Sequence, residues 1–144
     1  MILLYGFGNM AAAMLDGWLA AGRPPGDFAI YNPRPKPSPG GVAFHTDLPA
    51  GPFDAVVLGV KPQMLAEVAP IAQPLVGEGT MLVSILAGVE LASLARLFPR
   101  ADGIVRLMPN LAVALRKSPN ILAGSNLSAA RQAQATDLAS DLGS

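Results

Sequence analysis

The sequence predicts an α/β protein with an open, mostly parallel β-sheet and helices on both faces. Short apolar runs alternate with amphipathic stretches of helical length along the whole chain. Residues 54–60 are almost continuously apolar and rich in valine, which is typical of a central parallel strand covered on both faces. Because 144 residues is the length of one domain, we expect a single domain over residues 1–144.

The first predicted strand, residues 2–5, stops at Gly6, and a predicted helix, residues 9–21, follows Gly8 directly. With Ala11 in the third position, this turn follows the G-x-G-x-x-G/A pattern of dinucleotide-binding sites. The glycines allow a sharp turn and close approach to a pyrophosphate, and the N–H groups of the first helical turn attract an anion. A glycine loop without a ligand is the alternative, but the position after the first strand favours a nucleotide. The fold prediction is therefore Rossmann-like.

Four prolines at alternate positions distinguish residues 32–41. They exclude the helix that a regular βαβ unit places between its second strand, residues 28–31, and its third. We predict an extended crossover to a short third strand at residues 42–44, followed by a loop over residues 45–53.

The remaining predicted elements continue the alternation: a strand at 54–60, a short helix at 63–69 closed by Pro70, a strand at 80–85, a helix at 90–98, a strand at 104–108, a short strand at 120–123, and a helix from its cap Ser128 to about residue 142. On the first helix, one face is expected to be sheet-facing core, and Gly22 occupies the cap position at the C-terminal end. That face carries Met10, Met14, Gly17, Trp18 and Ala21.

Ligands of such sheets bind beyond the carboxyl ends of the strands. We expect residues 6–10, 32–36, 59–62, 86–88 and 108–110 to converge there on one crevice. Lys61 either lies beside the cofactor or is a solvated strand end. The small residues at 87–88 suit a flat ring or any tight turn.

The end of the second strand indicates which dinucleotide binds. An NAD site usually has Asp or Glu there for the ribose 2′-hydroxyl, whereas this chain has Asn32, with Arg34 and Lys36 close behind. A carboxylate would repel a 2′-phosphate and a guanidinium can grip one, so the sequence favours NADP, with NADPH preferred over NADH. The alternative is that both cations only solubilise a proline-stiffened loop.

Composition excludes several other functions. The net charge is zero with no basic cluster beyond residues 34–36, so we expect no nucleic-acid partner. No cysteine and a single histidine, His45, exclude disulfides and predict no metal site. The longest apolar stretch, residues 81–89, is too short to cross a bilayer, so we expect no membrane partner. The N-terminal residues lack the pattern of a signal peptide, so we expect a cytoplasmic protein. With 51% apolar and only 14% charged residues, some apolar surface is expected to be covered by a partner.

Four blocks resemble the pyrroline-5-carboxylate reductase family in order and spacing: residues 6–11, 60–63, 84–89 and 106–110. The resemblance covers nearly the whole chain and implies an N-terminal NAD(P)-binding domain. It implies NADPH-dependent reduction of 1-pyrroline-5-carboxylate, a small imino acid, to L-proline. The residues that it assigns to the cofactor are Gly6, Phe7, Gly8, Asn9 and Met10 for the pyrophosphate, Asn32 and Arg34 for the adenosine end, and Val60, Lys61, Pro62, Ala87, Gly88, Met108, Pro109 and Asn110 for the nicotinamide side. Because of its charge, we add Lys36 to the adenosine end.

The chain departs from this family in two places. The proline-rich segment replaces the family's helix between the second and third strands. The helical C-terminal domain, which makes the dimer and most of the substrate pocket, is missing, so the chain resembles a truncated form. We therefore expect no catalytic residue here, an inactive isolated chain, and a homo-oligomer for the full-length family. Two alternatives stay open: a non-catalytic nucleotide-binding or regulatory module, and a related imine or hydroxy-acid reductase.

Overall fold

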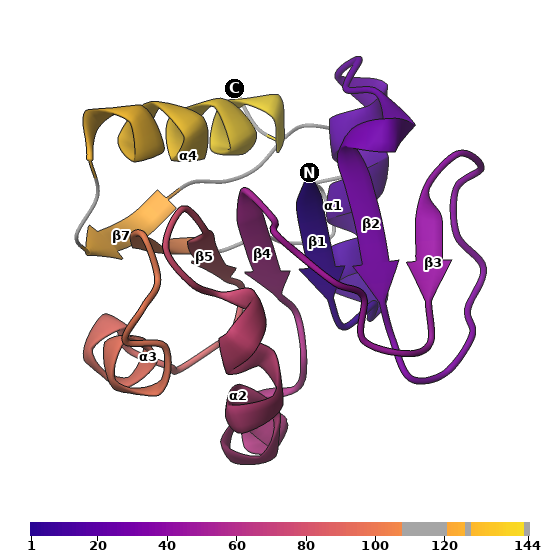
Figure 1. Ribbon diagram of the computed structural model, residues 1–144. Coiled ribbons are helices and arrows are strands. Elements are labelled where there is room, and N and C mark those ends of the chain that lie inside the picture. Colours follow the sequence, from indigo (N-terminus) through magenta and orange to yellow (C-terminus); the bar gives the residue numbers. More distant parts are fainter. Residues whose placement is uncertain (108–120, 126–127, 143–144) are drawn as a thin grey trace.

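A seven-stranded β-sheet forms the centre of the protein (Figure 1). The computed structural model describes residues 1–107, 121–125 and 128–142. The strands are β1 (Ile2–Tyr5), β2 (Phe28–Tyr31), β3 (Ala43–His45), β4 (Ala55–Leu58), β5 (Met81–Ser84), β6 (Ile104–Leu107) and β7 (Ile121–Ser125). Their order is β3-β2-β1-β4-β5-β6-β7, and all neighbours are parallel except β6 and β7. The predicted Rossmann-like sheet is confirmed, with an antiparallel strand at one edge.

In the part of the chain that the structure describes, four helices cover the two faces of this sheet: α1 (Asn9–Ala20), α2 (Leu65–Ala72), α3 (Leu91–Leu97) and α4 (Ala129–Leu142). Buried residues of α1 and α4 join one side of the sheet in one apolar cluster, and those of α2 and α3 join the other side in a second cluster. The central strands are buried along their whole length, as expected for parallel strands covered on both faces.

Trp18 is the centre of the α1 and α4 side of the core. Its side chain is fully buried and stacks on Phe28, with ring centroids 5.6 Å apart. Its indole Nε1 donates a hydrogen bond of 3.1 Å to the carbonyl oxygen of Leu138 in α4. One residue of the predicted core face thus joins α1, β2 and α4.

The end of α1 follows the prediction for Gly22. This glycine has φ +100°, which costs little without a Cβ atom. The N–H of Gly22 donates to Leu19, and the N–H of Arg23 donates to Trp18, so the last carbonyl groups of the helix are satisfied.

The connection between β2 and β3 contains neither a helix nor a strand, as the prolines predict. In Figure 1 it runs from the carboxyl end of β2 around the outer side of β3. The third strand is shifted by one residue from its predicted position, because His45 continues the pairing with β2: His45 lies opposite Tyr31, and its carbonyl oxygen accepts the N–H of Asn32. The strands β4 and β5 are shorter than predicted.

The prediction that Pro70 closes a helix is wrong. Pro70 lies inside α2, which continues to Ala72 and is flanked by the 3-10 turns Pro62–Met64 and Gln73–Leu75. Proline has a helical φ and removes one hydrogen bond, here to the carbonyl of Ala66. Both residues lie on the exposed side of α2, where water can bind that carbonyl, and the buried Leu65, Ala69 and Ala72 hold the helix to the sheet.

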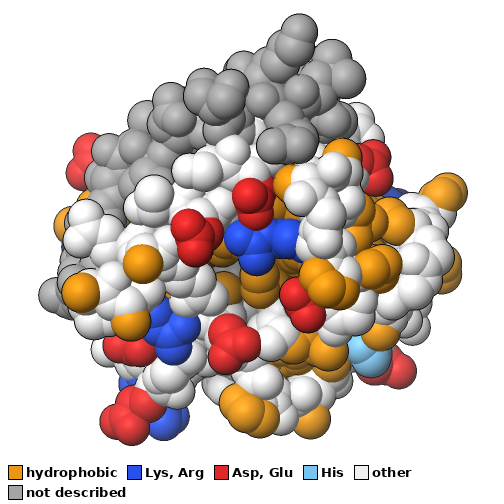
Figure 2. All heavy atoms as spheres, turned by 90° about the horizontal axis from the view of Figure 1, so that it is seen from above, with side chains coloured by type: hydrophobic (Ala, Val, Ile, Leu, Met, Phe, Trp, Pro, Cys, Tyr) orange, Lys and Arg blue, Asp and Glu red, His pale blue; other side chains and the backbone are white. Residues whose placement is uncertain are grey.

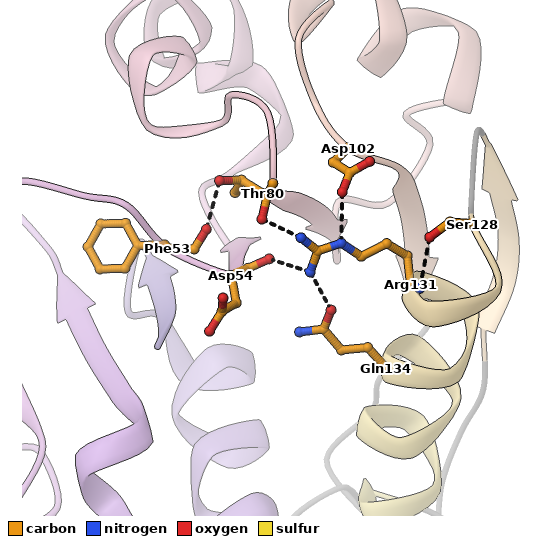
Figure 3. A network of polar contacts seen from close by, with 8 residues as sticks. Phe53, Asp54, Thr80, Asp102, Ser128, Arg131 and Gln134 are labelled. Carbon is orange, nitrogen blue, oxygen red and sulfur yellow. Dashed lines mark hydrogen bonds and ion pairs between the residues drawn. The ribbon is translucent and has the colours of Figure 1, made fainter.

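A network centred on Arg131 fixes α4 to the amino-terminal ends of the strands (Figure 3). Its guanidinium donates to the Asp102 carboxylate at 3.0 Å, to the carbonyl of Asp54 at 3.2 Å, to Gln134 at 2.7 Å and to the carbonyl of Gly79. Ser128 caps α4 as predicted, because its hydroxyl accepts the N–H of Arg131. A side chain that is only 17% exposed therefore joins α4 to the segments that precede β4, β5 and β6.

On the face seen from above, which includes the amino-terminal ends of the strands, acidic and basic side chains lie close together with apolar ones between them (Figure 2).

Within the described ranges, no helix has the length and apolar character needed to cross a membrane.

Candidate cofactor-binding site

A cleft of about 360 Å³ lies at the carboxyl ends of β1, β2 and β4. The strand order reverses here, since β1 pairs with β2 on one side and with β4 on the other. Such a reversal point is where nucleotides bind in open α/β sheets. The lining residues are Tyr5, Gly6, Phe7 and Gly8 after β1, Tyr31, Asn32, Pro33 and Lys36 after β2, Gly59, Val60 and Lys61 after β4, and Met64, Glu67, Val68 and Ile71 on and before α2.

Gly6 makes the turn between β1 and α1 possible. Its φ is +90°, and its N–H donates to the carbonyl oxygen of Tyr31 at 2.8 Å. A Cβ atom at this position would lie 3.1 Å from backbone atoms of Gly59 and Val60. Both the conformation and the lack of space require glycine, so the predicted role of Gly6 in the turn has a physical basis in the fold.

Gly8 presents the opposite case, because a Cβ atom there would meet nothing within 4 Å. The open space lies in the cleft, at the amino-terminal end of α1. Among the described residues, no side chain caps this end, and the first turn of α1 has no acidic residue. A pyrophosphate fits such a cradle, since a side chain would fill it and uncapped N–H groups with the helix dipole attract an anion.

Gly59 keeps β4 close to the glycine turn. A Cβ atom at Gly59 would lie 3.1 Å from the carbonyl oxygen of Gly6 and 3.4 Å from Cβ of Ala11. Ala11 is itself buried. The small side chain in the third position of the motif therefore lies against the start of the loop after β4.

Two side chains from the proline-rich connection bind the backbone of Phe7. The Asn32 carboxamide oxygen accepts the N–H of Phe7 at 3.0 Å, and the Lys36 ammonium donates to the carbonyl of Phe7 at 3.0 Å. The Asn32 amide nitrogen donates to the carbonyl of Arg34 at 2.7 Å. Asn32 and Lys36 thus bind both backbone polar groups of Phe7, the N–H and the carbonyl, and join the glycine turn to the segment after β2.

An apolar wall faces the glycine turn across the cleft. It consists of Met64, Val68 and Ile71, and Met64 and Ile71 are 40% and 50% exposed. The rings of Tyr5 and Tyr31, which also line the cleft, lie with centroids 4.8 Å apart. Burial, and to a smaller extent the neighbouring Tyr31, raises the pKa of the Tyr5 phenol to about 12, so Tyr5 stays neutral at physiological pH.

Sequence reasoning missed this wall and the carboxylate of Glu67 beside it. The spacing of residues 64, 67, 68 and 71 marks one helical face, opposite the buried face at 65, 69 and 72. The incorrect stop at Pro70 hid this signal, because it removed Ile71 from the helix.

The cleft brings together only part of the predicted site. The predicted residues that line it are Gly6, Phe7, Gly8, Asn32, Lys36, Val60 and Lys61. Other predicted residues do not line it, namely Asn9, Met10, Arg34, Pro62, Ala87 and Gly88. Ala87 and Gly88 are exposed in the turn after β5. Met108, Pro109 and Asn110 lie outside the described residues.

Comparison with known proteins identifies relatives of this chain, although no protein-family model matches it. The pyrroline-5-carboxylate reductase of Pseudomonas aeruginosa is 32% identical over 150 residues, which cover 99% of this chain and 55% of that protein. The chain is homologous to the N-terminal half of the pyrroline-5-carboxylate reductases. The Haemophilus influenzae pyrroline-5-carboxylate reductase is also 32% identical, over 76% of this chain and 43% of its own length. The chain spans about half the length of these curated relatives.

Structure comparison agrees on the fold. A crystal structure of pyrroline carboxylate reductase from Plasmodium falciparum with NADP bound superposes with a TM-score of 0.79 at 19% identity. The match covers 99% of this chain and 55% of that protein. The sheet and helices of this chain therefore correspond to one half of a pyrroline-5-carboxylate reductase fold.

Proposed function

We propose that this chain binds NADPH in the cleft and forms the cofactor-binding half of a pyrroline-5-carboxylate reductase. The observation that carries the proposal is the glycine turn and uncapped start of α1, placed where the strand order reverses. When bound, NADPH would supply a hydride to the imine carbon of 1-pyrroline-5-carboxylate, and the ring nitrogen would take a proton, which together give L-proline. The relatives' names support this substrate.

The chain's own residues bind and orient the cofactor. We assign Gly6, Phe7 and Gly8 to the pyrophosphate, and Asn32 and Lys36, which line the same cleft, to the adenosine end. The apolar wall of Met64, Val68 and Ile71 offers a face for a flat base. We assign Val60 and Lys61, which line the cleft after β4, to the nicotinamide side. We assign no catalytic residue to this chain, because its task is to hold two rings in a reactive orientation.

The preference for NADPH over NADH rests on charge at the end of β2. Asn32 is neutral and points its oxygen at Phe7, so no carboxylate from β2 opposes a 2′-phosphate. Lys36 brings a positive charge to the same end of the cleft. Glu67 of α2 also lines the cleft, and its negative charge lowers this preference, because it repels phosphate.

In this proposal, substrate binding and assembly of the oligomer depend on the half of the relatives' fold that this chain does not match. The complete enzyme is then a homo-oligomer whose imino-acid contacts come from regions that match the second half of the relatives.

A chimeric enzyme tests the proposed function. This chain replaces the N-terminal half of the Pseudomonas aeruginosa relative, and NADPH consumption is followed on addition of 1-pyrroline-5-carboxylate. The expected result is substrate-dependent oxidation of NADPH. A chimera that binds NADPH and leaves the imine unchanged would contradict the enzymatic role and favour a nucleotide-binding module.

A further inference from the structure

A second cleft, of about 320 Å³, lies where the chain enters β4, β5 and β6, at the opposite ends of the strands from the cofactor cleft. Pro52, Pro74 and Leu75 form its apolar part, and its charged lining residues are Glu78 and Arg100. It shares no lining residue with the cofactor cleft. We call it the amino-end cleft, and its volume is sufficient for a small molecule.

Hydrogen bonds join the three segments that line the amino-end cleft. The Thr80 hydroxyl donates to the carbonyl of Phe53 at 2.7 Å, next to Pro52 (Figure 3). The N–H of Thr80 donates to the carbonyl of Gly77 at 3.1 Å, and the carbonyl of Thr80 accepts the N–H of Asp102 at 2.8 Å. The backbone of the cleft is therefore held in place before a ligand binds, which lowers the entropy cost of binding.

Glu78 and Arg100 bring opposite charges to the amino-end cleft without neutralising each other. Both residues are exposed, and the ion pairs among the described residues, which engage Arg23, Arg131 and the N-terminal ammonium, include neither of them. The guanidinium of Arg100 lies over Gly77, since a Cβ atom there would be 3.7 Å from its Nη2 atom. The positive charge thus lies beside the turn that carries the negative one.

We propose that the amino-end cleft binds a small zwitterionic amino acid, with its carboxylate on Arg100, its ammonium on Glu78 and its side chain on the apolar part. Glu78 would repel a simple anion, and Arg100 would repel a simple cation. A guanidinium matches a carboxylate with two parallel hydrogen bonds, and a small aliphatic group or ring gains from contact with Leu75 and the two prolines. The inference does not depend on the proposed function, although L-proline belongs to this class of ligand.

An NMR chemical-shift titration of the isotope-labelled, 144-residue chain tests the inference with three ligands. L-Proline carries both charges, L-prolinol lacks the carboxylate, and N-acetyl-L-proline lacks the ammonium. We expect L-proline to shift the amide signals of residues 75–80 with a dissociation constant of about 1 mM. Both analogues should bind about tenfold more weakly or worse, because each loses one charged contact.

Two variants assign the two charged contacts. Arg100→Met should weaken L-proline about tenfold and leave L-prolinol equal or stronger, because prolinol has no carboxylate to lose. Glu78→Gln should weaken L-proline to a similar extent and leave N-acetyl-L-proline equal or stronger. Arg96→Met and Glu90→Gln are the matched controls, since both residues are exposed and line neither cleft, and they should change no affinity.

Several results would overturn the inference. No shift of the signals of residues 75–80 at about 20 mM L-proline would exclude the site. Displacement of L-proline by NADPH would place the ligand in the cofactor cleft. Equal affinities for the three ligands, or an L-proline affinity that neither variant changes, would show that the two charges do not hold the ligand. Failure of the proposed function has a different signature, because NADPH would then not bind while L-proline still shifts these signals.

Discussion

The carboxamide oxygen of Asn32 accepts a hydrogen bond from the N–H of Phe7 over 3.0 Å. This bond joins the end of β2 to the middle of the glycine turn after β1. The same position in an NAD site usually carries a carboxylate. A neutral acceptor here holds the turn and leaves the adenosine end of the cleft without a negative charge from β2.

Asn32→Asp should therefore reverse the cofactor preference. The aspartate keeps an acceptor for the N–H of Phe7 but places a negative charge near the proposed 2′-phosphate. We expect the affinity for NADPH to fall by about tenfold or more, roughly 1.4 kcal/mol per factor of ten, and that for NADH to stay equal or rise. Asn32→Leu is the control that removes the acceptor, and it should weaken both cofactors. Calorimetry of both variants measures this, and a uniform loss in Asn32→Asp would contradict the charge argument.

Glu67→Gln tests the negative charge of a residue of α2 that lines the cleft. The substitution keeps the size of the side chain and removes a charge that repels phosphate. We expect tighter binding of NADPH, about two- to fivefold at low salt, and a smaller gain as salt screens the interaction. Glu78→Gln, on an exposed residue away from this cleft, is the matched control. An unchanged NADPH affinity at low salt would show that Glu67 lies too far from the phosphates to matter.

Arg131→Met should destabilise the protein without touching the cleft. The substitution removes the bonds to Asp102, Asp54, Gly79 and Gln134 shown in Figure 3. We expect the free energy of unfolding to fall by about 2 kcal/mol, because several hydrogen bonds of a mostly buried guanidinium are lost together. Urea unfolding followed by the emission of the single, buried Trp18 measures the change.

Arg96→Met provides the comparison for that experiment. Arg96 is exposed, and its guanidinium donates a hydrogen bond of 3.3 Å to the Ser93 hydroxyl. Its loss should change the free energy of unfolding by less than about 0.5 kcal/mol. Equal unfolding midpoints for the Arg131 and Arg96 variants would refute the role of Arg131 in fastening α4.

The Tyr5 phenol predicts a pH dependence of stability at alkaline pH. Its pKa is raised from 10.0 to about 12 in the folded protein. Below pH 10 the phenol is neutral in both states, whereas between pH 10 and 12 it ionises more readily in the unfolded chain. Stability should therefore decrease as the pH rises through this window. Tyr5→Phe should reduce that decrease, as urea midpoints at several pH values would show; identical slopes in both proteins would contradict the raised pKa.

The sequence predicted the sheet well because its signals are local. The strand at Ile2–Tyr5, the strand at Phe28–Tyr31 and the glycine after α1 follow from apolar runs and glycine chemistry, and each stands where predicted. The absence of a helix in residues 32–41 likewise follows from proline alone. Pro70 was misjudged because the burial of Leu65, Ala69 and Ala72 offsets one lost hydrogen bond, and burial depends on the whole fold.

Part of the candidate site was predictable because its signals are also local. The G-x-G-x-x-G/A motif predicts the glycine turn, and the strand ends predict Asn32 and Lys61. The exposed face of α2, which the prediction missed, completes the lining of the cleft. The contacts of Lys36 and Asn32 with Phe7 depend on how the proline-rich connection folds back, which no spacing rule encodes. Glu67 and Ile71 were missed because their position depends on how α2 crosses the sheet.

Calorimetric titration of the 144-residue chain with NADPH and with NADH tests the central claim most directly. The account predicts one site per chain, with NADPH bound at least about tenfold more tightly than NADH. It also predicts that the difference shrinks as salt is raised, because a 2′-phosphate contact is charge-dependent. Absence of binding for both nucleotides would contradict the assignment of the cleft, and equal affinities would contradict the selection of NADP(H).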